Sequence, residues 1–117
     1  VGLDGLTSLV WLSIWSNRFE GTMLWLRSMA SLIDYIADSN KLHGSILDEP
    51  FSNNTLDYLC IYKNYLSGAL PEAGLSSLTI IRGLHLFINS FSGALPEMGL
   101  RTLSILKVLT LGNNRLA

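Results

Sequence analysis

The chain has 117 residues, of which 49% are apolar and 15% charged, and its net charge is −1. This length suits one structural unit, and a near-neutral chain has no field to gather phosphate backbones or anionic lipid, which argues against nucleic acid as a partner. The single cysteine excludes an internal disulfide framework and a multi-cysteine metal site, and no apolar run approaches the roughly 18 residues needed to span a bilayer.

One apolar frame with a fixed asparagine recurs five times along the chain. Successive asparagines lie 23, 24, 25 and 25 residues apart. The frame is L-x-x-L-x-L-x-x-N-x-L, which is that of leucine-rich repeats, and only Tyr35 and Ala37 depart from it. One of these inward residues is larger and the other smaller, an exchange of volume that a core tolerates when the total is kept. The five copies contain Leu9-Leu12-Ile14-Asn17-Phe19, Leu32-Tyr35-Ala37-Asn40-Leu42, Leu56-Leu59-Ile61-Asn64-Leu66, Ile81-Leu84-Leu86-Asn89-Phe91 and Leu106-Leu109-Leu111-Asn114-Leu116.

Each copy predicts a short strand with one buried face. In the third copy, Leu59 and Ile61 alternate with outward residues, which is the period-two pattern of a half-buried strand. Strands are therefore expected at 12–15, 35–38, 59–62, 84–87 and 109–112, stacked about 4.8 Å apart in a parallel sheet. Because each strand is too short to be stable alone, neighbouring repeats must supply a shared core.

The asparagine follows each strand, where the chain turns. A buried amide can satisfy backbone groups of the turn that have no partner in the sheet. We therefore expect the five asparagines to stack in a hydrogen-bonded ladder with a structural role.

A second motif follows the asparagine in each complete copy: an apolar residue, then glycine, then another apolar residue. Gly21, Gly44, Gly68 and Gly93 keep this offset, which implies either a special backbone conformation or a close approach. Pro71 and Pro96 close two of the copies and suit an extended or turn backbone that needs no amide donor. The positions that carry this tail are Phe19-Glu20-Gly21-Thr22-Met23, Leu42-His43-Gly44-Ser45-Ile46, Leu66-Ser67-Gly68-Ala69-Leu70 and Phe91-Ser92-Gly93-Ala94-Leu95.

The L-x-G-x-L-P tail resembles the plant-specific class of leucine-rich repeats, as in plant receptor-like kinase ectodomains and polygalacturonase-inhibiting proteins. The resemblance covers essentially the whole chain. It implies a second, narrower sheet formed by the tails. It also implies an extracellular or membrane-associated setting, while organellar and cytoplasmic locations stay open.

The fold class expected is an α/β-type solenoid, mostly strand and loop: a curved stack with a concave parallel sheet and an irregular convex side. Residues 1–117 form a single domain of about five repeats in this interpretation. The ends show no cap, so the chain is expected to be a fragment of a longer protein, with neighbouring protein covering at least one end. The polar segment from Asp48 to Thr55 is expected to be irregular.

Outward strand positions line the concave face and hold the candidate binding residues. Five large aromatic residues occur there, more than a solvated face needs, and such residues are enriched at interface hot spots. Two of them, Tyr62 and Phe87, fall on adjacent strands and are expected to touch. Ordinary scattered surface aromatics, an unseen flanking segment and a sugar or other small ligand remain as alternatives. The candidate partner-binding residues are Trp11, Trp15, Asp34, Asp38, Tyr58, Tyr62, His85 and Phe87.

No catalytic or cofactor site is predicted. Asp34 and Asp38 are about 13 Å apart along a strand, too far to share a proton. Cys60 and His85 are neighbours in the middle outward column, but an open face offers no third orienting group for a Cys-His nucleophile. No metal-ligand spacing or phosphate-binding glycine loop is present. Asn53, in Asn53-Asn54-Thr55, is a possible glycosylation acceptor.

The function expected is protein–protein recognition through the aromatic concave face, without enzymatic activity. The alternative is a structural accessory subunit held permanently in a larger, possibly membrane-associated assembly.

Overall fold

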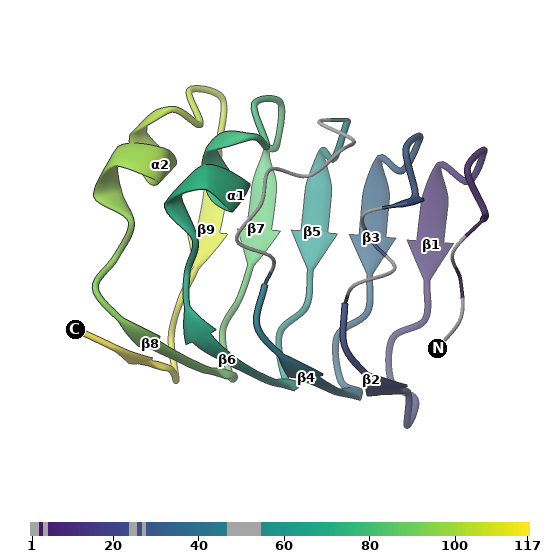
Figure 1. The fold of residues 1–117 in the computed structure, drawn as a ribbon, viewed down its shortest axis with the longest axis horizontal. Helices are drawn as coiled ribbons and strands as arrows, with labels where there is room; N and C mark the ends of the chain where they lie inside the picture. Colours follow the sequence, from purple (N-terminus) through teal and green to yellow (C-terminus); the bar gives the residue numbers. More distant parts are fainter. Residues whose placement is uncertain (1–2, 4, 24–25, 27, 47–54) are drawn as a thin grey trace.

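The computed structural model of the chain describes residues 3, 5–23, 26, 28–46 and 55–117. Five parallel strands, one from each repeat, lie side by side in what we call the main sheet (Figure 1). Each strand pairs with the strand of the next repeat, so the frame positions align in register. The strands are β1 (Trp11–Ser13), β3 (Asp34–Ile36), β5 (Tyr58–Cys60), β7 (Gly83–His85) and β9 (Val108–Thr110).

These strands begin one residue before the predicted ranges and end two residues before them. Pairing starts early because Val10 O accepts hydrogen bonds from both Ile33 N and Asp34 N. Bonds between repeats also continue past the strand ends, from Ala37 N to Cys60 O at 2.9 Å and from Ser39 N to Tyr62 O at 3.1 Å. The regular strand nevertheless stops, because the residue before each asparagine takes a left-handed backbone conformation, with φ 58° at Ser39.

The glycine-containing tails form a second five-stranded parallel sheet, as the resemblance implied. All four tail glycines have positive φ, between 80° and 102°. At Gly68 and Gly93 space does not explain the glycine, because an added Cβ would meet nothing nearer than 3.5 Å and 3.9 Å; the backbone conformation is the reason. The strands of this second sheet are β2 (Glu20–Gly21), β4 (Lys41–Gly44), β6 (Tyr65–Ala69), β8 (Ser90–Gly93) and β10 (Arg115–Leu116).

The convex side of the third and fourth repeats carries two short helices, α1 (Glu72–Ser76) and α2 (Glu97–Arg101). Pro71 and Pro96 precede them, where no amide donor is needed. The Glu72 carboxylate accepts a hydrogen bond from the backbone N–H of Gly99. A Cβ on Gly99 would approach the backbone oxygen of Glu72 to 2.9 Å, so glycine is required here for space.

The core lies between the two sheets and the convex side and runs without a break through the stack. Leu59, Ile61, Leu84 and Leu86 have no exposed surface. Leu109 occupies the same frame position as Leu84 in the last repeat, yet 37% of its surface is exposed. The difference follows from stacking, because a frame leucine is buried only when a repeat lies on each side of it.

The asparagines follow the strands in one row, as predicted, and those of the second to fifth repeats bridge neighbouring repeats. Asn64 Nδ2 donates to Ile61 O of its own repeat and to Ala37 O of the preceding repeat, both at 3.1 Å. Its Oδ1 accepts a hydrogen bond from Leu42 N at 3.0 Å. The ladder therefore runs through backbone groups between the amides. Asn40, Asn89 and Asn114 repeat the pattern.

Candidate functional site

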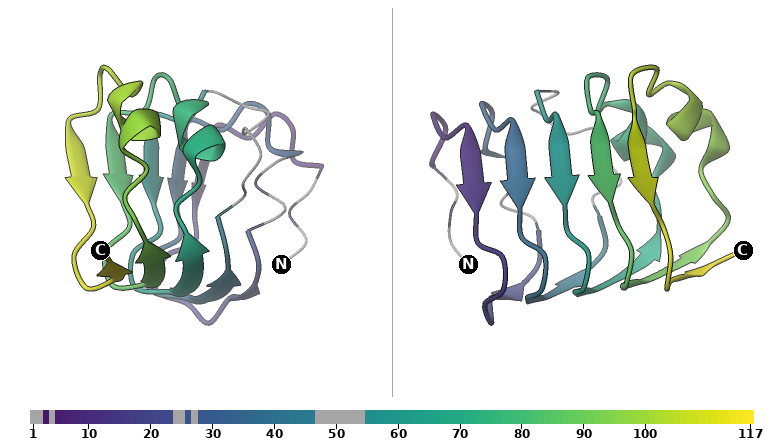
Figure 2. Two further views of the ribbon diagram at one scale, coloured as in Figure 1. Left: turned by 60° about the vertical axis from the view of Figure 1, so that its left-hand side comes forward. Right: turned by 180° about the vertical axis from the view of Figure 1, so that it is seen from behind.

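The candidate site is the face of the main sheet that points away from the core, which we call the open face. The two helices lie on the opposite side of the main sheet, and no described element covers the open face (Figure 2). Strand register fixes its side chains in rows across the repeats. One such row runs Trp11, Asp34, Tyr58, Gly83 and Val108.

Two tryptophans project from the first repeat. Trp11 has 66% of its surface exposed and Trp15 has 58%. Trp11 is the first residue of β1, and Trp15 lies at an outward position after β1. They are the most exposed of the aromatic side chains predicted for the site. Two large indole surfaces in one repeat offer much area for burial by a partner.

The other aromatic residues are half-buried because they pack on each other. Tyr62 and Phe87 stack with ring centroids 4.2 Å apart and an interplanar angle of 10°, the contact that their neighbouring positions predicted. Tyr58 lies against His85 at 5.2 Å. It also lies over Gly83, where an added Cβ would come within 2.7 Å of its ring. The absence of a side chain at position 83 thus lets Tyr58 lie across β7.

Asp38 and Cys60 are more enclosed than their outward positions suggested. Asp38 is only 5% exposed and accepts hydrogen bonds from the Cys60 thiol at 3.6 Å and from the Ser39 hydroxyl at 3.3 Å. Burial raises the pKa of Tyr62 to about 12, and interaction with the Asp38 carboxylate adds to the rise. Asp38 is thus a polar centre around which neighbouring side chains of the open face are held.

The Cys60 and His85 arrangement has the wrong electrostatics for a nucleophile. Burial, followed by the negative charge of Asp38, raises the pKa of the Cys60 thiol to about 12, so it stays protonated near neutral pH. His85 contacts Tyr58 and the Thr110 hydroxyl, and burial lowers its pKa. Within the part of the chain that the structure describes, no group of three or more His, Cys, Asp or Glu residues could hold a metal ion.

Sequence reasoning missed a charged border along the open face. Arg82 Nε donates to Asp57 Oδ1 at 2.7 Å, and a second guanidinium nitrogen reaches the other carboxylate oxygen. The hydrogen bond from Arg82 lowers the pKa of Asp57. Together with Lys107, this pair lines a shallow open groove of about 470 Å³ whose apolar part includes Trp11 and Tyr58. The available signal was opposite charge at one frame position in adjacent repeats.

The predicted site residues fall into three groups. Trp11, Asp34 and Tyr58 line the shallow groove, and His85 joins this group through its contact with Tyr58. Asp38, Tyr62 and Phe87 form the second group around the buried carboxylate, and Trp15 stands exposed in the first repeat. Asn53 lies outside the described residues.

The chain is similar to solved structures of plant proteins. A chain of the BIR3–SERK2 complex from Arabidopsis thaliana is 28% identical with a TM-score of 0.85, covering 91% of this chain and 56% of that one. The ectodomain of the Arabidopsis receptor kinase HAESA, in complex with an extended IDA peptide hormone, is 30% identical with a TM-score of 0.87, covering 96% of this chain and 19% of that one. The ectodomain of the receptor kinase SOBIR1 from Arabidopsis thaliana is 29% identical with a TM-score of 0.81, covering 91% and 56%.

The chain is therefore a leucine-rich repeat protein. More particularly, its repeats are of the plant-specific-like class seen in plant receptor-kinase ectodomains. It spans from about a fifth to just over half of the length of these structures. No protein-family model matches the sequence, and no curated protein matches it.

Among the helices of the described residues, none has the length and apolarity that crossing a bilayer requires.

Proposed function

We propose that this chain is a protein–protein recognition module that binds a protein or peptide through the open face. The observation that carries the proposal is the presence on one face of two exposed tryptophans, Trp11 and Trp15, and of a stacked aromatic pair in the third and fourth repeats, Tyr62 and Phe87. Rigid aromatic side chains of this kind bury much area at little cost in conformational entropy.

The structural neighbours support a protein partner. One is a complex of two plant proteins, and another holds a peptide hormone ligand. In this proposal the five aromatic residues of the open face are the anchors, while Asp34 and His85 supply polar contacts. The anchors are Trp11, Trp15, Tyr58, Tyr62 and Phe87. Asp38, which is buried, acts by fixing the orientation of Tyr62. An extracellular or membrane-associated location accords with the ectodomain neighbours.

The proposal includes no enzymatic activity. Cys60 donates a hydrogen bond to the Asp38 carboxylate, and its raised pKa favours the thiol, which argues against a cysteine nucleophile.

The test is a pair of substitutions measured against a partner identified by crosslinking mass spectrometry. Trp15→Ala combined with Tyr62→Ala should weaken partner binding by about 2–4 kcal/mol in biolayer interferometry, since both side chains are proposed anchors. Met98→Ala is the matched control, because Met98 is 75% exposed and lies on α2. Unchanged affinity of the double variant, with its circular dichroism intact, would refute the open face as the binding surface.

The second candidate is a permanent structural subunit, which the exposed apolar residues of the two end repeats favour. Leu6 and Val10 at one end and Ile105 and Leu109 at the other are each at least 37% exposed. Recovery only as a stoichiometric component of a larger assembly would support this candidate. Reversible binding with salt-dependent association would support recognition.

A further inference from the structure

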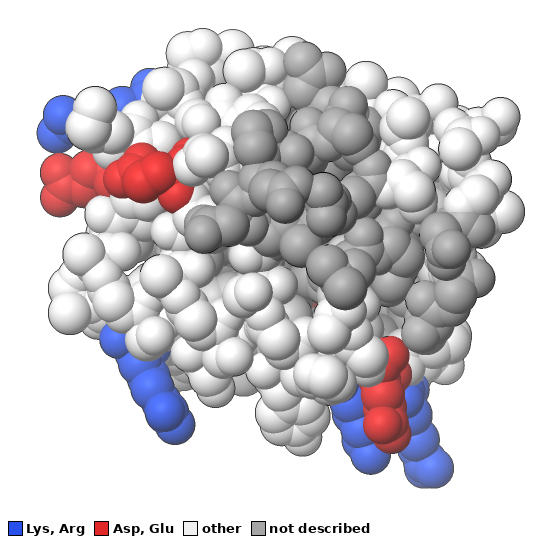
Figure 3. Space-filling view, in the orientation of Figure 1, with Lys and Arg blue, Asp and Glu red and all other residues white. Residues whose placement is uncertain are grey.

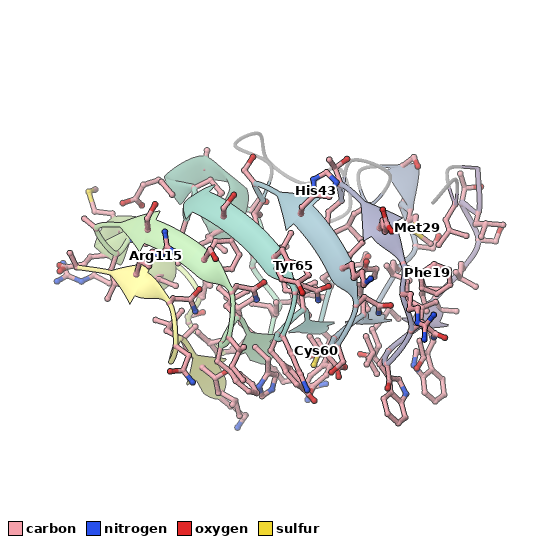
Figure 4. The ribbon with its side chains drawn as sticks, turned by 90° about the horizontal axis from the view of Figure 1, so that it is seen from below. Phe19, Met29, His43, Cys60, Tyr65 and Arg115 are labelled. Carbon is pink, nitrogen blue, oxygen red and sulfur yellow. The ribbon has the colours of Figure 1, made fainter. Side chains whose placement is uncertain are left out.

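A second groove lies where the chain turns from the main sheet to the second sheet, away from the open face. We call it the turn groove. Its volume is about 780 Å³, and it is formed by the residues on either side of the asparagines in the first four repeats. Figure 4 views the molecule from the side of the second sheet, with His43 and Tyr65 on its neighbouring strands β4 and β6.

The turn groove carries positive charge from three successive repeats. Arg18, Lys41 and Lys63 line it and are exposed, and none of the described residues that line it is acidic. None of the three takes part in the ion pairs of the described residues, which join Arg82 to Asp57 and Arg101 to Glu97. Lys and Arg side chains project from the lower edge of the molecule at two places, and acidic side-chain surface lies beside those at the lower right (Figure 3).

Two acidic residues lie near this row. Asp38 is buried, and its carboxylate accepts a hydrogen bond from the groove residue Ser39. Glu20 on β2 is exposed and pairs in register with Lys41 of β4, yet forms no ion pair with it within the described residues. Glu20 therefore lowers the local positive potential without neutralising a particular cation. Removal of the Glu20 carboxylate should therefore strengthen the binding of anions in the groove, whereas removal of a groove cation should weaken it.

The far end of the turn groove is apolar. Tyr65 follows Asn64 directly and is 64% exposed, and Ile88 in the next repeat is 39% exposed. Neighbouring repeats are about 4.8 Å apart, so the groove from Arg18 to Ile88 extends over roughly 14 Å, which matches four or five residues of an extended chain. A uniform polyanion would leave the aliphatic Ile88 without a matching group.

We propose that the turn groove is a second binding site, for an extended acidic peptide segment. Carboxylates of the segment lie against Arg18, Lys41 and Lys63, and an apolar side chain next to the acidic run packs on Tyr65 and Ile88. Charge-assisted hydrogen bonds supply attraction at one end and apolar burial fixes the register at the other. The site is separate from the open face, so its occupation does not depend on the function proposed above.

The probe is a fluorescein-labelled peptide, Glu-Ser-Glu-Ser-Glu-Leu-Gly, together with its reversed sequence, titrated with the chain at low salt and followed by fluorescence anisotropy. Lys41→Gln should weaken binding of the better peptide by about two- to fivefold, and Lys41→Gln with Lys63→Gln by more than about tenfold. Glu20→Gln should strengthen it by about twofold. Lys107→Gln, an exposed cation outside the groove, is the matched control and should have no effect.

The apolar end is tested by a double-mutant cycle between Tyr65→Ala in the protein and Leu→Ala in the peptide. The two changes should be coupled, since each removes the same contact. Trp15→Ala with Tyr62→Ala should leave peptide binding unchanged, which separates this site from the open face. The proposal is overturned if neither peptide binds, or if Lys107→Gln weakens binding as much as Lys41→Gln does. Equal competition by a heparin oligosaccharide with no effect of the peptide leucine would also overturn it, because a non-peptide polyanion is then the better ligand.

Discussion

At the scale of single residues, the amide side chain of the frame asparagine joins adjacent repeats through hydrogen bonds. Asn64 is 7% exposed and satisfies backbone groups of two repeats at once. Asn17 has the same frame position and is exposed, and among the described residues its amide donates within its own repeat, to Ile14 O and Trp15 O. The same residue type therefore contributes differently to stability according to whether its amide bridges two repeats.

This difference predicts unequal costs of substitution. Asn64→Ala should lower the free energy of unfolding by about 2–4 kcal/mol, because buried backbone groups such as Leu42 N lose their partner. Asn17→Ala is the matched control and should cost less than about 1 kcal/mol, since water replaces its hydrogen bonds. Urea unfolding followed by circular dichroism measures both. Equal costs would show that the ladder adds nothing beyond the local turn.

The turn residue before the asparagine predicts a stabilising change. Ile88 has φ 53°, although a β-branched side chain disfavours the left-handed region. Ile88→Asn should raise the free energy of unfolding by about 0.5–1 kcal/mol, because asparagine tolerates this conformation better. The control is Ile80→Asn: Ile80 is 46% exposed and is not among the residues with positive φ. A gain at both positions, measured as a shift in urea midpoint, would contradict the backbone explanation.

At the scale of elements, β3 and its continuation show how the second repeat departs from the frame while keeping a filled core. Tyr35 replaces a leucine and Ala37 replaces a larger aliphatic residue, and both have no exposed surface. A larger side chain and a smaller one thus share the volume that two aliphatic side chains occupy in the third repeat. The sequence predicted this exchange because both positions point inward.

The exchange predicts strong coupling between the two positions. Tyr35→Leu alone should destabilise the fold by about 1–3 kcal/mol through a cavity, and Ala37→Ile alone by a similar amount through overpacking. The double variant restores the usual frame and should be more stable than the sum of the two single effects by at least about 1 kcal/mol. Thermal unfolding of the four proteins in the cycle measures this, and additive effects would show that the two side chains do not share one space.

At the scale of the whole molecule, the stack leaves apolar surface at both ends. Leu109 is the clearest case, since its equivalent Leu84 is fully buried by the following repeat. We therefore propose that neighbouring protein covers at least one end in the functional state. Exposed apolar ends of this kind favour association.

This proposal predicts concentration-dependent association of the isolated chain. Size-exclusion chromatography with light scattering should show species larger than the monomer as the concentration rises. Leu109→Lys should shift the distribution toward monomer, because it places a charge on the end surface. Met98→Lys, at a side chain that is 75% exposed on α2, should not. A monodisperse, stable monomer of the unchanged chain at all concentrations would count against a covered end.

The sequence by itself determined the repeat count, the parallel main sheet, the asparagine row and the glycine turns. It could do so because each frame position has the same local environment in every repeat, so the same type of residue recurs at that position in successive repeats. It also placed the outward aromatic residues and the contact of Tyr62 with Phe87. Only the tertiary structure decided that Asp38 and Cys60 are enclosed, that Tyr58 lies over Gly83, and that Arg82 pairs with Asp57. These outcomes depend on side-chain packing between residues about 25 positions apart. Because the size of one side chain decides how much space its neighbour in the next repeat has, the repeating pattern does not predict them.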